Sequence, residues 1–379
     1  MIGRALLALA CVIMAGGPSL AQQSPAGLTV PRILPPFDAT AAGCTPPAGL
    51  ARVLAFAQDN EREFMNGVAR GLAAAARDRR LDFRPAQARN DGARQIEQVQ
   101  QFRTARVGAL VSAPVDAVAL APHLQQVIWS GAWVGSVVAP PATEILNAPQ
   151  YLTGKALGDA AAAYIRDRLR GRANVVLLTH DSLQFLAPRF AAMRDSLKAV
   201  PGAIIVADLS PATVNKEGGE AAMRTILLAH PNVDVVLGAD TVVLGALAAL
   251  RAAGKARPDQ FLGGIDGEPE AVAEIKRGGP YKASISLNSP VFAYALGQHA
   301  ADWLEGRSVP QATDILPSAL SASILAQYEA DLADPASVWR DVTRRNAYLR
   351  MYGNICHDTR DQYLNFPWSS ERRPTEPIR

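Results

Sequence analysis

Short apolar runs alternate along the chain with longer segments in which apolar residues recur every three or four positions. Ala51–Ala57 is a nearly continuous apolar run, and the segment after it places Phe64, Val68 and Leu72 at helical spacing. Continuous runs of this length are typical of strands that are buried on both faces, and the longer period is typical of amphipathic helices. The pattern predicts repeated strand–helix units, which form a parallel sheet covered by helices on both faces.

The alternation continues in two series, separated by the Pro140-Pro141 break. The first series has further apolar runs at 107–113 and 133–138, and the second has runs at 173–179 and 203–208. A chain of 379 residues exceeds what one hydrophobic core usually serves. We therefore predict an α/β fold with two doubly wound parallel-sheet lobes, joined by a hinge of several crossings.

Both ends of the chain depart from this pattern. Arg4 precedes the apolar run Ala5–Ala15, which is too short to span a membrane, and Ser19-Leu-Ala21 supplies small residues for a cleavage site. We predict a secretory signal over residues 1–21; lipoprotein processing at Cys11 is the alternative. Residues 22–50, rich in Pro, Ala and Gly, are expected to form an extended arm, and residues 321–379 a C-terminal extension.

Export changes the interpretation of the cysteines. Cys44 and Cys356 are the two that remain after removal of the signal, and in an oxidising compartment such a pair favours a disulfide. A loop of this length would constrain the unfolded chain by about 4 to 5 kcal/mol in the chain-entropy model. Two unpaired thiols are the alternative.

Composition and motifs argue against several classes of function. The 38 basic and 35 acidic residues nearly balance, which gives no indication of nucleic-acid binding. The five histidines lack metal-ligand spacing, and the nucleophile-elbow, phosphate-loop, zincin and dinucleotide-binding motifs are absent from the sequence. We therefore expect no metal, no cofactor and no enzymatic activity.

Two aspartates follow short apolar strands in the second series. Asp240 comes after the run Val233–Gly238, Asp266 comes after Phe261–Ile265, and a helical pattern follows each aspartate. Open α/β sheets bind ligands at the carboxyl ends of their strands. This placement indicates that the two carboxylates face a small ligand.

Several local patterns in a fixed order identify a family resemblance. Besides the two aspartates they are Asp59-Asn60-Glu-Arg-Glu-Phe64, Arg189 before Ala192-Met-Arg-Asp-Ser-Leu, and Asn288-Ser-Pro290. Residues 51–316 thereby resemble the sugar-binding, ribose-binding-like branch of the type I periplasmic binding proteins, which bind substrates for ABC transporters. The resemblance implies ligand binding in a cleft between the lobes by the following residues: Asn60, Phe64, Arg189, Asp240, Asp266 and Asn288.

The roles implied for these residues have structural alternatives. Asp240 and Asp266 would accept hydrogen bonds from ligand hydroxyls, but a helix N-cap and a turn contact are the respective alternatives. Phe64 would pack on a sugar ring or belong to the core. Val138, Ala139 and Ala187 stand where the family has charged residues, so the ligand is expected to be less hydroxylated, or larger, than a common monosaccharide.

The resemblance also implies the domain boundaries and partners. Residues 51–150 with 289–308 would form the N-terminal lobe, and residues 151–288 with 309–320 the C-terminal lobe, with residues 321–379 clasping the N-terminal one. Interlobe crossings are expected near 140–155, 280–290 and 306–316. The expected protein is a periplasmic monomer that delivers a small polar ligand to an ABC permease in the inner membrane. A receptor for a membrane sensor kinase is the alternative, followed by an enzyme on the same scaffold.

Overall fold

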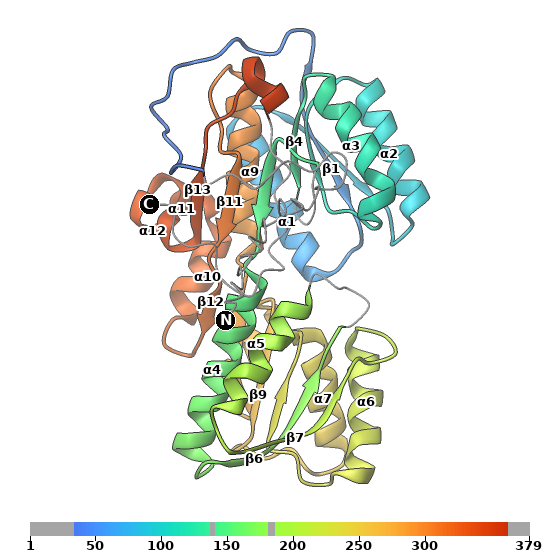
Figure 1. Cartoon of the computed structure of the whole chain (residues 1–379), viewed down its shortest axis with the longest axis vertical. Coiled ribbons are helices and arrows are strands. Elements are labelled where there is room, and N and C mark those ends of the chain that lie inside the picture. The colour runs from blue at the N-terminus through green and yellow to red at the C-terminus, as the bar shows by residue number, and fades with distance from the viewer. Residues whose placement is uncertain (1–33, 137–140, 181–185, 363–379) are drawn as a thin grey trace, which may run out of the picture.

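The computed structural model describes residues 34–136, 141–180 and 186–362, which form two α/β lobes stacked along the long axis of the molecule (Figure 1). The predicted signal, the start of the arm and the positions Val138 and Ala139 lie outside the described residues. The described helices include none that has both the length and the apolar character needed to span a bilayer.

The first lobe contains a seven-stranded sheet in the order β13-β11-β5-β4-β3-β1-β2. All neighbours pair in parallel except β13, which runs antiparallel to β11. The strands are β1 (Ala51–Gln58), β2 (Asp82–Gln87), β3 (Val107–Ser112), β4 (Trp133–Ser136), β5 (Glu144–Asn147), β11 (Ala312–Ile315) and β13 (Leu349–Tyr352).

Helices cover both faces of this sheet, as the continuous apolar runs predict. Leu54 and Phe56 of β1 point into a core shared with helices α1 (Glu63–Asp78) and α9 (Ser289–Leu304). Val53 and Ala55 point to the opposite face, toward α2 (Gly92–Thr104) and α3 (Ala117–Trp129). Successive side chains of a strand point to opposite faces, so a strand buried on both sides needs an unbroken apolar run.

The second lobe contains a six-stranded sheet in the order β12-β10-β9-β8-β6-β7, parallel except for β12. One face packs against α4 and α5, and the other against α6, α7, α8 and α10. The strands are β6 (Arg172–Leu178), β7 (Gly202–Leu209), β8 (Val235–Leu237), β9 (Phe261–Ile265), β10 (Tyr281–Ser286) and β12 (Ser318–Leu320). The helices are α4 (Gln150–Arg168), α5 (Ala187–Lys198), α6 (Lys216–Ala229), α7 (Asp240–Ala252), α8 (Pro269–Arg277) and α10 (Leu325–Ala333).

The fold confirms two parallel-sheet lobes but differs from the predicted boundaries near the third crossing. Residues 309–320 were assigned to the second lobe, yet β11 pairs with β5 of the first lobe through Thr313 and Leu146. The interval also contains β12, and this strand does belong to the second sheet, where it pairs with β10. The assignment was wrong for β11 because a four-residue strand carries too little pattern to reveal which sheet it extends.

The C-terminal extension also differs from its predicted place beside the first lobe alone. Helix α10 packs into the core of the second lobe, whereas α11 (Pro335–Arg340), α12 (Val342–Tyr348) and β13 lie on the first lobe. In Figure 1 the extension runs from the waist of the molecule along one side of the upper lobe. The extension therefore spans the two lobes.

The chain passes between the lobes at the carboxyl edges of both sheets. Three passages, at 147–150, 286–289 and 315–318, overlap the predicted intervals, and the extension adds a fourth at 333–335. Two of these passages leave directly from the ends of β5 and β10. Because parallel strands end at one edge, the carboxyl ends of the two sheets face each other across the waist.

A disulfide confirms the predicted pairing of Cys44 with Cys356. The backbone N–H of Cys44 also donates to the carbonyl of Gly306, just beyond α9, and Pro36 forms a bridge with Tyr352 of β13. The described part of the arm is thus fixed to the first lobe and to the extension at once.

We expect the disulfide to stabilise the folded chain. Cys44→Ser together with Cys356→Ser should lower the free energy of unfolding by about 2 to 5 kcal/mol, because the unfolded chain loses a closed loop. Urea unfolding and limited proteolysis of the extension would measure the loss. Reductant should destabilise the native protein and leave the double variant unchanged; equal curves for the native protein with and without reductant would contradict the expectation.

Candidate functional site

The two aspartates at the carboxyl edge of the second sheet have different surroundings. Asp240 is completely buried, and its carboxylate accepts hydrogen bonds from Tyr281 Oη at 2.7 Å, from Ser284 Oγ at 2.7 Å and from the backbone N–H of Glu268 at 2.8 Å. It makes no side-chain cap for its own helix α7. Burial raises the pKa of Asp240 to about 6, and the hydrogen bonds from Ser284 and Tyr281 oppose the rise. Asp240 thus joins β10 and the start of α8 to α7.

Asp266 lies directly after β9, at the carboxyl edge of the second sheet. It is partly exposed and has φ of 119°, a conformation that non-glycine residues rarely adopt. Its carboxylate accepts no hydrogen bond from any residue that the structure describes. Burial raises the pKa of Asp266, while the positive charges of Arg189 and Arg62 oppose the rise. Strained backbone at such a point is typical of functional sites.

Glu268 is a second open acceptor, which the sequence patterns did not single out. It lies two residues after Asp266, and its carboxyl group has no hydrogen-bond partner within the described part of the chain. Burial raises the pKa of Glu268 to about 8, and the negative charges of Asp266 and Asp240 add to the rise. Near neutral pH this carboxyl group is mostly protonated, so it can donate as well as accept a hydrogen bond.

Arg62 supplies a cation from the first lobe, between β1 and α1. Asn60 Oδ1 accepts from the backbone N–H of Arg62 at 3.0 Å and from its Nε at 2.9 Å, and Asp59 Oδ2 lies 3.3 Å from the guanidinium. The charge of Arg62 lowers the pKa of both Asp266 and Glu268, across the boundary between the lobes. The structure therefore gives Asn60 the role of positioning Arg62, which is the N-cap of α1.

Arg189 and Phe64 lie at the margins of this arrangement. Arg189, buried within α5, donates from Nε to Gln150 Oε1 at 2.9 Å, and its charge acts on Asp266. Burial lowers the pKa of Arg189. Phe64 is partly buried at the edge of the first core, with its ring 5.9 Å from that of Phe292. The ligand contacts expected of Arg189 and Phe64 stay predictions.

Asn288 lies at a hinge passage between β10 and α9. Its Nδ2 donates to Ser318 Oγ at 3.0 Å, which joins the second passage to the third, and its backbone N–H donates to Ser286 Oγ at 3.0 Å. Its Oδ1 is buried without a partner among the described residues. A ligand contact through Oδ1 is compatible with this geometry and also stays a prediction.

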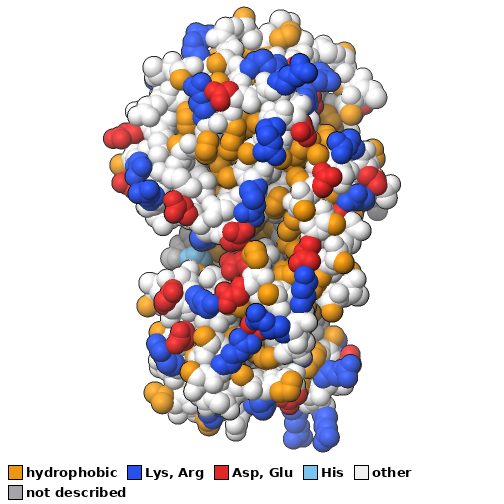
Figure 2. All heavy atoms as spheres, turned by 180° about the vertical axis from the view of Figure 1, so that it is seen from behind, with side chains coloured by type: hydrophobic (Ala, Val, Ile, Leu, Met, Phe, Trp, Pro, Cys, Tyr) orange, Lys and Arg blue, Asp and Glu red, His pale blue; other side chains and the backbone are white. Residues whose placement is uncertain are grey.

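The molecule narrows to a waist between the two lobes, and acidic side chains gather there on the face shown in Figure 2. This is the level at which the carboxyl ends of the two sheets meet. The positive charge of Arg62, from the first lobe, acts at this level on both Asp266 and Glu268 of the second lobe.

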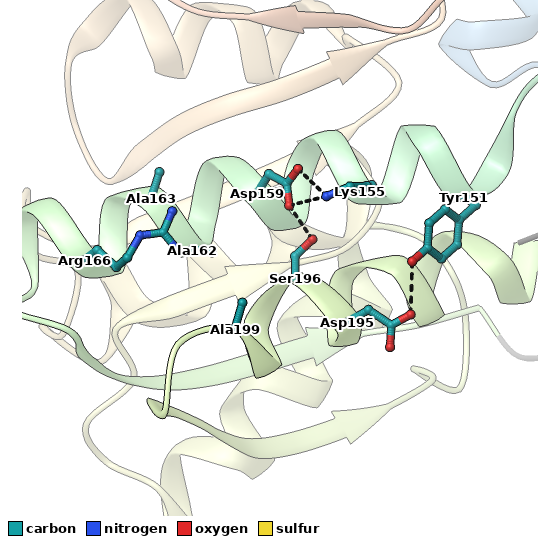
Figure 3. A pocket seen from close by; sticks show the side chains of 9 residues that line it. All are labelled: Tyr151, Lys155, Asp159, Ala162, Ala163, Arg166, Asp195, Ser196 and Ala199. Carbon is teal, nitrogen blue, oxygen red and sulfur yellow. Dashed lines mark hydrogen bonds and ion pairs between the residues drawn. The ribbon is translucent and has the colours of Figure 1, made fainter. Parts of the chain in front are cut away.

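A surface pocket of about 680 Å³ lies elsewhere, between α4 and α5 of the second lobe (Figure 3). Five of its polar residues bond within the pocket: Lys155 Nζ contacts Asp159 at 2.7 Å, Ser196 donates to Asp159, and Tyr151 donates to Asp195. The pocket receives no residue from the first lobe, so interlobe motion would not enclose a molecule bound there.

Metal chemistry finds little support among the described side chains. Among the described residues, one group has the spacing of metal ligands, and it consists of Cys44, Cys356 and Asp358. The disulfide occupies both of its sulfur atoms. Metal coordination by cysteine requires thiolates.

Comparison with known proteins gives consistent similarities. Residues 53–308 match the periplasmic binding protein domain family. The ribose import binding protein of Bacillus subtilis is 26% identical over 257 residues, which cover 65% of this chain and 79% of that protein.

Solved structures show the same fold. A Mycobacterium smegmatis protein in complex with β-D-fucofuranose has a TM-score of 0.66 at 21% identity, covering 79% of this chain and 99% of that one. An ABC transporter solute-binding protein from Bacillus halodurans with bound myo-inositol has a TM-score of 0.65 at 20% identity, covering 75% and 99%.

Asp240 and Asp266 should respond differently to mutation. Asp240→Ala removes the acceptor of two buried hydroxyl groups, so we expect a loss of about 1 to 3 kcal/mol for each group left unsatisfied. Asp266→Ala removes no described hydrogen bond and should leave the free energy of unfolding nearly unchanged. Urea unfolding of both variants would compare them, and equal destabilisation would contradict the distinction.

Glu268 should make the protein less stable as the pH rises. Its ordinary pKa is 4.5 and its folded pKa is about 8. Between these values the native protein retains a proton that the unfolded chain has released, so the stabilisation is full below about pH 4.5 and is lost as the pH rises through about 8. In Glu268→Gln the fall in urea midpoint over this range should be smaller. Glu217, an exposed acid in the first turn of α6 whose charge is not among those acting on Glu268, is changed to Gln as the control and should keep the native slope.

Proposed function

The chain belongs to the periplasmic binding protein domain family, and from this premise we propose that it binds a small polar ligand of the sugar or polyol class between its lobes. It then delivers the ligand to an ABC permease in the inner membrane. Binding without chemical turnover is the proposed activity. The single observation that supports it most strongly is the pair of open carboxyl groups, Asp266 and Glu268, on which the charge of Arg62 from the opposite lobe acts.

The chemistry of the site suits a hydroxylated ring. An ionised carboxylate accepts hydrogen bonds from hydroxyl groups, a protonated carboxyl group donates as well as accepts, and a guanidinium donates to hydroxyl oxygens. Asp266, Glu268 and Arg62 supply one group of each kind. The relatives named for ribose, β-D-fucofuranose and myo-inositol are consistent with a ligand of this class.

A ligand in this position would favour the closed arrangement of the lobes. Groups on both walls can contact it at once when the lobes approach, and contacts made in that form alone shift the equilibrium toward it. Hinge closure of this type uses a few residues between rigid lobes. The short passages at 147–150, 286–289 and 315–318 are the places where the backbone would turn.

The cellular setting follows from the same proposal. We infer export through the predicted signal at residues 1–21, a periplasmic location, and action as a monomer. The disulfide between Cys44 and Cys356 is consistent with an oxidising compartment. The permease would meet the closed form.

A thermal-shift screen of protein purified from the periplasm tests the proposal. D-ribose, D-allose, D-fucose and myo-inositol are suitable probes. A ligand at 100 times its dissociation constant should add about 2.7 kcal/mol to the free energy of unfolding. At least one member of the sugar or polyol class should raise the melting temperature, and Asp266→Asn should abolish the rise.

Glu270→Gln is the matched control, because Glu270 is an exposed acid four residues away that pairs with Lys216. It should retain the full shift. A ligand that still raises the melting temperature of Asp266→Asn would contradict the proposed site. A screen in which another class of compound gives a shift and hydroxylated compounds give none would contradict the proposed ligand class.

A further inference from the structure

The C-terminal extension begins as part of the second lobe. Leu325 and Tyr328 of α10 are buried in that lobe's core, together with residues of α7 and α8. On the outer side, Glu329 pairs with Lys276 of α8, with Nζ 2.6 Å from the carboxylate. Helix α10 is thus fixed to the lobe that holds Asp266.

The extension ends as part of the first lobe. Trp339 of α11 and Tyr348 of α12 pack against that lobe's core, and Leu349 of β13 is buried within it. β13 adds an antiparallel edge strand to β11, and Cys356 is bonded to Cys44 beyond it.

Polar contacts link the two halves of the extension. The buried carboxylate of Asp331 on α10 accepts from Tyr348 Oη at 2.5 Å and contacts the guanidinium of Arg344, both on α12. The connection from α10 to α11 is the single residue Asp334, whose side chain caps α11 by accepting from the backbone N–H of Ser337. A helix of the second lobe is therefore held to the first lobe by a short connection and by a buried carboxylate.

Tyr328 carries this linkage to the turn that bears Asp266. Its hydroxyl lies 2.8 Å from Ser286 Oγ and donates to the carbonyl of Gly267 at 3.3 Å. Gly267 has φ of 70°, and a Cβ there would lie 2.5 Å from the same hydroxyl, so the turn and Tyr328 fit closely. Ser286 in turn accepts from the backbone N–H of Asn288 at a hinge passage.

We propose that the C-terminal extension is an interlobe strap: Asp331 limits the separation of the lobes, and Tyr328 is a positioning residue that fixes the Asp266–Gly267 turn. The strap makes the hinge stiffer than the three other passages alone would make it. While Asp331 stays bonded to α12, α10 cannot move away from the first lobe together with the rest of the second lobe. The restraint on the lobes is independent of ligand, and the importance of Tyr328 for binding rests on the proposed function.

Distance measurements between the lobes test the first part without ligand. Val118 on α3 and Leu228 on α6 are 85% and 87% exposed, so both can be changed to Cys and spin-labelled without reductant, which keeps the native disulfide. Pulsed electron spin resonance should give one narrow distance distribution for the otherwise native protein. Tyr348→Phe and Asp331→Asn should each broaden it and add a population at longer distance.

Glu329→Gln is the matched control, because it breaks an ion pair of the same helix that lies wholly within the second lobe. It should leave the distribution narrow. Unchanged distributions in both Tyr348→Phe and Asp331→Asn, or equal broadening in the control, would overturn the strap.

Hydrogen exchange tests the second part. In Tyr328→Phe, amides of residues 266–268 should exchange about fivefold faster, the factor expected for one lost hydrogen bond, while amides of β6 and β8 keep their rates. Exchange of residues 266–268 at the native rate would overturn the positioning role. Because neither measurement uses a ligand, failure of the proposed function would leave both results unaffected.

Discussion

Two parallel sheets joined at their carboxyl edges impose the constraint on which the rest of this structure depends. Chain passages that leave the ends of β5 and β10 require the two carboxyl edges to face each other. Parallel strands end at one edge, so side chains that follow different strands gather at the waist although they lie far apart in sequence. In this way the charge of Arg62, after β1, acts on Asp266, after β9. The position of the site is therefore set by the topology of the two sheets, and the individual residues determine its chemistry.

The same topology gives two similar local patterns different roles. Asp240 and Asp266 each follow a short apolar strand, but the first is surrounded by Tyr281 and Ser284 of β10 and the second is not. A buried carboxylate is stable when hydrogen bonds compensate its lost hydration, and Asp240 has three of them. Their donors lie 28 to 44 residues away in sequence, so the strand–aspartate–helix pattern could not distinguish a carboxylate that holds the lobe together from one that remains open.

Sequence patterns predicted the strands that carry a clear apolar run and missed the shorter or more polar ones. The runs that became β1, β3, β6 and β9 are mostly apolar, because helices cover both sides of each sheet. β2 is an exposed edge strand with Pro85 inside it, and its polar sequence gave no strand signal. The short strands β11, β12 and β13 depend on pairing partners rather than on a period. Arg62 and Glu268 were missed for a related reason: their importance comes from the opposite charges brought beside them by folding.

The extension changes how the hinge works. In a two-lobe receptor with short passages, the stiffness of the hinge depends on the backbone of those passages and on whatever contacts bridge the lobes. Here one buried carboxylate, Asp331, joins α10 to α12 in a position where water cannot easily replace its partners. Separation of α10 from α12 would break the contacts of Asp331 with both Tyr348 and Arg344 and leave it only Gln327 of its own helix, so it is unfavourable. The strap therefore limits how far the lobes can part, and it does not prevent them from approaching each other over a ligand at Asp266 and Glu268.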